Sequence, residues 1–123
     1  MHTLLLVEDD PSTSDLLTRL FARHGYRVMI ARNGMAALQL MKSQSADLVL
    51  LDVRMPEMNG LQVLEAMRKD PRTEELPVIV YSISGDLGTR DKALQLGAAD
   101  FWVKGTIGFP EMIEGVRARL KAS

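Results

Sequence analysis

The 123-residue chain contains no cysteine. This absence excludes disulfide bonds, thiolate metal sites and cysteine nucleophiles, so any chemistry must use oxygen and nitrogen groups. No apolar run approaches the roughly 20 residues that a transmembrane helix needs. The opening "MHTLLLVEDDP" becomes acidic too soon for a secretory signal. We therefore expect a cytoplasmic protein that does not interact with a membrane.

The chain also lacks a strong excess of either charge. Its 15 Lys and Arg residues and 16 Asp and Glu residues leave a formal net charge of -1. A surface that binds nucleic acid needs clustered positive charge, so we predict no direct nucleic acid binding. No glycine-rich phosphate-binding fingerprint follows the first apolar run, which disfavours nucleotide binding.

What the chain does have is the length and apolar content of one compact domain. Of its 123 residues, 46% are hydrophobic, and no linker or low-complexity tract divides them. Five short apolar runs predict strands at residues 2–7, 26–31, 47–51, 77–81 and 100–103. Three of these runs are apolar nearly throughout, as in a parallel sheet that is buried on both faces. We therefore expect a single domain over residues 1–123, with helices on both faces of the sheet.

Amphipathic stretches separate the predicted strands. Two of them carry a stripe of large apolar residues at helical spacing. The stripes are Leu16, Leu17, Leu20 and Phe21, and Phe109, Met112, Ile113, Val116 and Leu120. Pro11 after Asp10 suits the first turn of a helix that an aspartate caps. Five strands that each precede a helix predict a doubly wound α/β sandwich, in which sites gather at the carboxyl ends of the strands.

Polar residues follow four of the predicted strands at that edge. They are Glu8, Asp9 and Asp10 after the first strand, Asp52 after the third, Ser82 after the fourth and Lys104 after the fifth. Taken singly, each has an ordinary structural reading, such as a helix cap, a turn residue or a solvated lysine. Taken together, the carboxylates would repel one another without a cation, and hard oxygen ligands suit Mg²⁺. The cluster therefore predicts a site for a metal ion and an anion.

Four motifs, in matching order and spacing, resemble those of the receiver domain of two-component response regulators. They are "LLLVEDD", "LLDVRMPEMNGLQVLEAMR", "PVIVYS" and "GAADFWVKG", and the resemblance covers essentially the whole chain. It implies a flavodoxin-like (βα)5 fold with strand order 2-1-3-4-5. It also implies an aspartyl phosphate, Mg²⁺ as cofactor, and a sensor histidine kinase or phosphotransfer protein as the phosphoryl donor.

The resemblance also implies the roles of the acidic residues. Asp52 is then the phosphoacceptor and a metal ligand, and Asp9 ligates Mg²⁺ directly. Glu8 acts mainly through metal-bound water, and the backbone carbonyl of Arg54 completes the protein's share of the coordination. A carboxylate at the end of a buried strand is fixed by the sheet behind it and open to an incoming phosphohistidine, which is what phosphoryl transfer requires.

The same resemblance assigns the residues around the phosphoryl group. Ser82 and Lys104 would hold its oxygens, while Ser82 and Phe101 would form the switch that changes the surface. Phe101 lacks the hydroxyl of the tyrosine often found at its position, so the switch must rely on packing, and a static core role is the alternative. The lifetime of the phosphoryl group would depend partly on Arg54 and Ser84.

The clearest departure from the family pattern follows Lys104. Receivers usually have a proline there, often in a cis bond, whereas this chain has Gly105. A cis bond costs about 0.5–1 kcal/mol before proline and about 2.5–4 kcal/mol before other residues. We therefore predict a trans Lys104–Gly105 bond.

The leading interpretation is a stand-alone receiver that signals by phosphorylation-dependent binding to another protein. It would not be an enzyme beyond its own phosphoryl transfer and autodephosphorylation. One alternative is a degenerate receiver that serves only as an interaction module. The other is an aspartyl-phosphate phosphatase of the haloacid-dehalogenase type, although Arg54 replaces the second aspartate that such enzymes carry two residues after the first.

Overall fold

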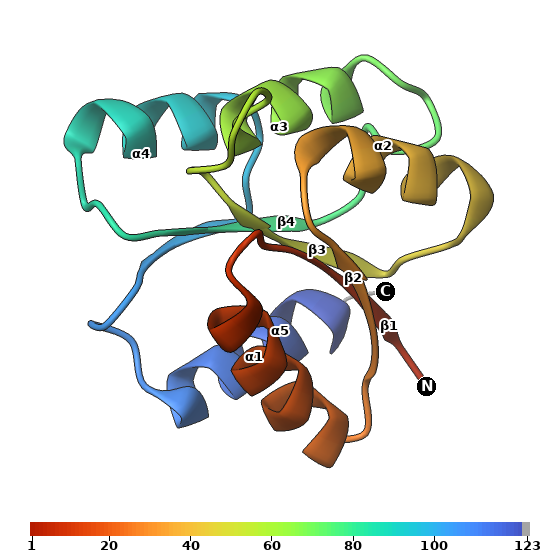
Figure 1. The fold of residues 1–123 in the computed structure, drawn as a ribbon, viewed down its shortest axis with the longest axis vertical. Coiled ribbons are helices and arrows are strands. Elements are labelled where there is room, and N and C mark those ends of the chain that lie inside the picture. Colours follow the sequence, from red (N-terminus) through yellow and green to blue (C-terminus); the bar gives the residue numbers. More distant parts are fainter. Residues whose placement is uncertain (122–123) are drawn as a thin grey trace.

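The computed structural model describes residues 1–121, in which strands and helices alternate from end to end (Figure 1). The strands are β1 (Thr3–Val7), β2 (Arg27–Ala31), β3 (Leu48–Asp52), β4 (Val78–Ser82) and β5 (Asp100–Val103). The helices are α1 (Pro11–Arg23), α2 (Gly34–Ser43), α3 (Gly60–Arg68), α4 (Leu87–Gln95) and α5 (Phe109–Lys121). Within the described part of the chain, no helix is long and apolar enough to cross a membrane.

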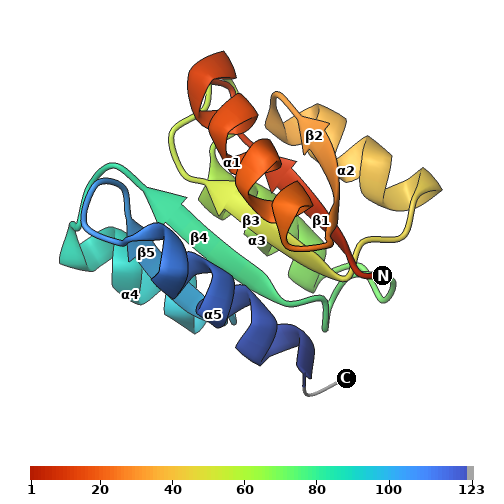
Figure 2. The ribbon, with the colours of Figure 1, turned by 90° about the horizontal axis from the view of Figure 1, so that it is seen from below.

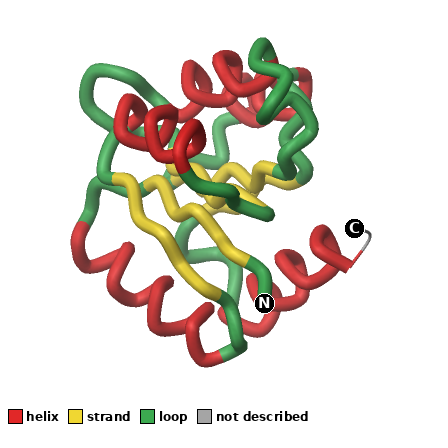
Figure 3. Tube along the Cα trace, turned by 90° about the vertical axis from the view of Figure 1, so that its right-hand side faces the viewer, coloured by secondary structure: helices red, strands yellow, loops and turns green. Residues whose placement is uncertain are grey.

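The strands form one parallel sheet in the order β2-β1-β3-β4-β5. Helices α2, α3 and α4 cover one face, and α1 and α5 cover the other (Figures 1 and 2). The sheet therefore forms the middle layer of three, which is also visible in the trace of Figure 3. The predicted doubly wound sandwich, its flavodoxin-like strand order and its helices on both faces are confirmed.

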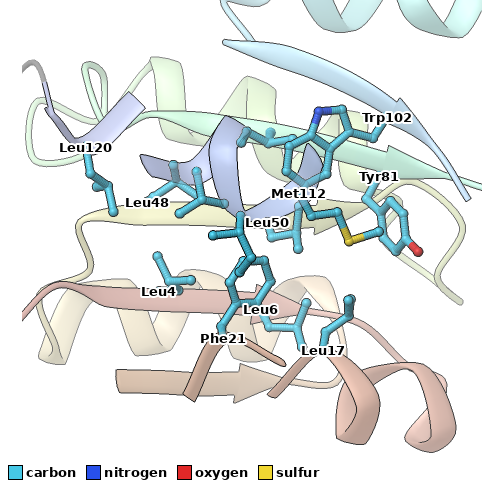
Figure 4. Packing of buried hydrophobic residues seen from close by; sticks show 13 residues of the cluster. Leu4, Leu6, Leu17, Phe21, Leu48, Leu50, Tyr81, Trp102, Met112 and Leu120 are labelled. Atoms are coloured by element: carbon cyan, nitrogen blue, oxygen red, sulfur yellow. The ribbon is translucent and has the colours of Figure 1, made fainter. Parts of the chain in front are cut away.

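Alternate residues of each central strand supply the two halves of the core. Leu4 and Leu6 of β1 belong to the cluster under α1 and α5 (Figure 4). Leu5 and Val7 belong to the cluster under α2, α3 and α4. All residues of β3 and β4 are buried, because a parallel sheet between two helical layers has no solvent-facing side. This explains the unbroken apolar runs in the sequence.

The two helical stripes were predicted correctly except at one residue each. Leu16 is 49% exposed and Phe109 is 45% exposed. In α1 the buried residues are Ser14, Leu17 and Phe21, and Leu16 lies about 100° around the helix from Leu17, outside that face. Phe109 opens α5, ahead of the turns that pack against the sheet from Met112 onward.

Polar side chains fix where the helices begin. The Asp10 side chain accepts a hydrogen bond from the Thr13 backbone N–H at 2.9 Å, and Pro11 opens α1, as predicted. At α3 the Asn59 side chain accepts from the Gln62 N–H, and the Gln62 side chain accepts from the Asn59 N–H. Such caps satisfy amide groups that the helix itself leaves free, so α1 and α3 each start at a defined distance from the preceding strand.

One arginine joins the two loops that lead into β4 and β5, at the amino-terminal ends of these strands. Arg68 ends α3, and its guanidinium donates to backbone carbonyl oxygens at 3.0–3.1 Å; the acceptors are Thr73, Glu74, Leu76, Leu96 and Gly97. Burial lowers its pKa from the usual value. The side chain thus ties the α3–β4 connection to the C-terminal end of α4. Nothing in the sequence pattern indicates this role.

Replacing Arg68 by alanine is expected to lower the free energy of unfolding by about 3 kcal/mol, because several carbonyl groups lose a charged donor at once. Arg72→Ala serves as the control, since Arg72 is 58% exposed and pairs with Asp70 at the surface; its cost should stay below about 1 kcal/mol. Urea-induced unfolding of both variants measures the difference. Equal losses for the two arginines would contradict the bridging role of Arg68.

Candidate functional site

The carboxyl edge of the sheet brings together four of the polar residues predicted from the sequence. Asp52 is the last residue of β3 and Ser82 the last residue of β4, whereas Glu8 and Lys104 directly follow β1 and β5. Asp52 and Ser82 therefore lie inside their strands, one residue beyond the predicted strand ends. Glu8 is 1% exposed, Asp52 4% and Ser82 1%, so the sheet and its helices hold them firmly.

A lysine joins the two buried carboxylates. The Lys104 Nζ donates to Glu8 Oε1 at 2.8 Å and lies 3.4 Å from Asp52 Oδ2. The lysine side chain is 20% exposed, so the ion pairs lie mostly out of water. Its backbone is fixed as well, because the Lys104 N–H donates to the Ser82 carbonyl at 2.8 Å.

These contacts perturb the acid–base properties of the site. Burial and the neighbouring Glu8 raise the pKa of Asp52 to about 7, although Lys104 and the Arg54 N–H oppose the shift. Burial alone would lower the pKa of Lys104, but the hydrogen bond to Glu8 and the charge of Asp52 outweigh it and raise that pKa overall. One lysine therefore does not fully compensate the two carboxylates.

A third carboxylate completes a group that fits a divalent cation. Glu8, Asp9 and Asp52 each place one carboxylate oxygen within 4.8 Å of the others. Counted as ionised, the three carboxylates and Lys104 carry two net negative charges, which one dication balances. Hard oxygen donors of this kind suit Mg²⁺. Asp10 takes no part in this group, since its side chain caps α1 and accepts from Thr13.

The connection from β3 to α3 packs against the backbone of Asp52. Met58 N–H donates to the Pro56 carbonyl at 2.8 Å across Glu57, whose φ is 69°. This is a tight γ-turn, and a residue other than glycine is strained there. A Cβ on Gly60 would clash with the Asp52 carbonyl oxygen, so only glycine permits this close approach. The sequence pattern gives no sign of this positive φ.

The predicted switch residues lie on two neighbouring strands. Ser82 Oγ accepts from the Ser84 N–H at 3.2 Å, and Ser84 Oγ accepts from the Asp86 N–H at 3.2 Å. Phe101 of β5 is half-buried and packs against the cluster under α2, α3 and α4. Trp102 points to the other face and packs in the cluster with α5.

The residue after Lys104 adopts a conformation that glycine tolerates. Gly105 has a φ of 83°, and all described peptide bonds are trans, including Lys104–Gly105. The predicted trans bond is confirmed. A Cβ on Gly105 would meet nothing within 4 Å, so this glycine is required by its backbone angle and not by crowding.

Comparison with known proteins agrees with this geometry. A family model described as the response regulator receiver domain matches residues 4–117. The chain belongs to this receiver family. Among curated proteins, the transcriptional regulatory protein CpxR of Escherichia coli is 38% identical over 123 residues, which cover 100% of this chain and 51% of CpxR. The chain spans about half the length of such relatives.

Solved receiver structures superimpose closely on this one. The response regulator TrrA of Thermotoga maritima, in complex with Mg²⁺ and BeF, is 30% identical with a TM-score of 0.87. The alignment covers 98% of this chain and 100% of TrrA. The receiver domain of the sensor histidine kinase PA1611 of Pseudomonas aeruginosa, with magnesium coordinated in its active site cleft, is 25% identical with a TM-score of 0.89. That alignment covers 98% of both chains.

The sequence pattern did not identify one residue that lies beside the site. Tyr81 of β4 pairs with Asp52 in the sheet register, and Lys104 Nζ lies 5.2 Å from the centre of its ring. The available signal was its place directly before Ser82, on a strand adjacent to that of Asp52. The apolar run "PVIVY" instead suggested a core residue, which Tyr81 also is.

The raised pKa of Asp52 predicts how the stability of the metal-free receiver depends on pH. The usual pKa is 3.8 and the folded value is about 7, so the folded state binds a proton more tightly than the unfolded state. The free energy of unfolding should therefore fall as the pH rises from about 4 to about 7. Asp52→Asn removes this charge, and we expect it to raise stability at pH 8 by on the order of 1 kcal/mol.

Thermal unfolding of both proteins at pH 5 and pH 8 measures this effect. Millimolar Mg²⁺ should reduce the advantage of the Asp52→Asn variant at pH 8, because a bound cation compensates the carboxylates. If the two proteins differ in stability by the same amount at both pH values, the raised pKa of Asp52 is contradicted.

Proposed function

We propose that this receiver accepts a phosphoryl group on Asp52, with Mg²⁺ bound, and signals by phosphorylation-dependent binding to another protein. The single observation that carries the proposal is the buried Asp52 carboxylate, fixed at the end of β3 beside two further carboxylates and one lysine. A sensor histidine kinase or a phosphotransfer protein is the donor in this proposal. We propose no direct contact of the domain with nucleic acid or membrane.

Asp52 is the nucleophile in this mechanism. One of its carboxylate oxygens attacks the phosphorus of a phosphohistidine, a new O–P bond forms, and the P–N bond breaks as the imidazole leaves and takes up a proton. The sheet register and the Gly60 contact hold the Asp52 backbone in place. Such transfer depends mainly on positioning and on stabilising charge at the phosphoryl oxygens.

Asp9, Asp52 and the backbone carbonyl of Arg54 would hold Mg²⁺ directly, and Glu8 would act through water. The bound ion would neutralise charge on the phosphoryl oxygens. This assignment is supported by the three carboxylates within 4.8 Å of one another. It is also supported by the magnesium reported for the TrrA and PA1611 receivers.

Lys104 and Ser82 would bind the phosphoryl oxygens. Lys104 already lies 3.4 Å from Asp52 Oδ2, so a small shift of its ammonium brings it to a phosphoryl oxygen. The Ser82 hydroxyl, which accepts from the Ser84 N–H, is free to donate its proton to the same group. Its movement would let Phe101 change its packing, while Arg54 and Ser84 would influence how fast water removes the phosphoryl group.

The proposal is tested by incubating the purified protein with Mg²⁺ and acetyl phosphate. One hydroxylamine-sensitive phosphoryl group should form on Asp52, detected by intact mass and by peptide mapping. Asp52→Asn should abolish labelling, because an amide is not a nucleophile here. Asp86→Asn is the matched control, since Asp86 caps α4 at the surface, and it should leave labelling unchanged.

Other outcomes identify the alternatives. A wild-type protein that takes no label would be a degenerate receiver that acts only through protein contacts. Multiple turnover of simple phosphate esters would indicate a phosphatase of the haloacid-dehalogenase type. Undiminished labelling of the Asp52→Asn variant would refute Asp52 as the phosphoacceptor.

A further inference from the structure

The ring of Tyr81 contacts Lys104 at the site, and none of the roles described above uses this ring. It precedes Ser82 on β4 and pairs in register with Asp52 on one side and Trp102 on the other. Tyr81 therefore lies between the strand of the nucleophile and the strand that leads to Lys104. The Lys104 ammonium lies over its ring, 5.2 Å from the centroid, within the range of a cation–π interaction.

The tyrosine ring is held in place by the core. Tyr81 is 8% exposed and belongs to the cluster under α1 and α5. Figure 4 shows the ring beside Met112, with its hydroxyl directed away from the leucines of the central strands. A ring packed in this way has little freedom to move, so it presents a fixed surface to the ammonium.

The turn around Lys104 fixes its backbone, since the Thr106 N–H donates to the Val103 carbonyl at 3.1 Å, but it does not by itself fix the position of the ammonium. Gly105 adopts a positive φ, and the space beside it is open. The remaining attractive partners of the ammonium are the carboxylates of Glu8 and Asp52. A bound cation would compete with the ammonium for these carboxylates, and phosphorylation would consume one oxygen of Asp52. The face of the Tyr81 ring would still attract the ammonium in both states.

We propose that Tyr81 is a positioning residue that holds the Lys104 ammonium beside Asp52 through the face of its ring. This inference rests on the proposed function, because it concerns how Lys104 is placed to receive the phosphoryl oxygens. Because the aromatic face attracts the ammonium, a phenylalanine at position 81 should preserve the position of Lys104, whereas a leucine should not.

The position of the ammonium can be measured without any phosphorylation. In the wild-type protein the ring current of Tyr81 should shift the Lys104 Hε and Hζ NMR signals upfield relative to those of surface lysines. The shift should persist in Tyr81→Phe and disappear in Tyr81→Leu. A Lys104→Arg variant identifies the signals. Lys104 signals at the surface-lysine position in the wild type would overturn the proposal, even if Tyr81→Leu fails to fold.

The functional consequence is tested with acetyl phosphate and Mg²⁺. Tyr81→Leu should slow labelling of Asp52 by about three- to tenfold, the size of effect expected for a mostly buried cation–π contact, and Tyr81→Phe should retain the wild-type rate. Phe21→Leu is the control for lost packing, because Phe21 lies in the same cluster and contacts Tyr26. It should lower stability without slowing labelling.

The outcomes separate this inference from the proposed function. The wild-type protein could show the upfield Lys104 signals but take no label. This result would support Tyr81 as the partner of Lys104 and overturn the proposed function. A labelled wild-type protein whose rate is equal in Tyr81→Leu overturns the positioning role. Equal slowing by Tyr81→Leu and Phe21→Leu also overturns it, because lost packing alone would then explain the effect.

Discussion

The contact of Lys104 with Glu8 and Asp52 is the interaction on which the site depends. Two carboxylates that are almost fully buried share one ammonium, and burial together with Glu8 raises the pKa of Asp52 to about 7. A buried charge that is only partly compensated is costly, and it persists only where the surrounding structure is stable enough to hold it. The parallel sheet provides that stability, because β3 and β4 are buried along their full length.

Close backbone contacts hold the connections at both ends of the strands. Gly60 allows the chain to pass directly against the Asp52 backbone, and the γ-turn at Glu57 keeps the connection short. On the opposite edge, Arg68 binds two loops together through backbone carbonyl groups. These contacts fix the backbone at both ends of the strands, and such fixed surroundings give a functional site positional accuracy.

The apolar pattern of the sequence predicted the parallel sheet and the gathering of Glu8, Asp9, Asp52, Ser82 and Lys104 at its carboxyl edge, because sites in this fold class lie there. The strand order was implied by the resemblance to receiver domains. It did not predict what depends on packing between distant segments. The exposure of Leu16 and Phe109, the carbonyl contacts of Arg68 and the ring beneath Lys104 all arise from neighbours far away in the chain.

The most direct test of this account is to measure the protonation of Asp52. A pH titration monitored by ¹³C NMR of its side-chain carboxyl group gives the midpoint. In metal-free protein we expect a midpoint near pH 7, which millimolar Mg²⁺ lowers because the cation stabilises the carboxylate. A midpoint close to 3.8, the usual value, in metal-free protein would contradict the account. So would a raised midpoint that Mg²⁺ leaves unchanged.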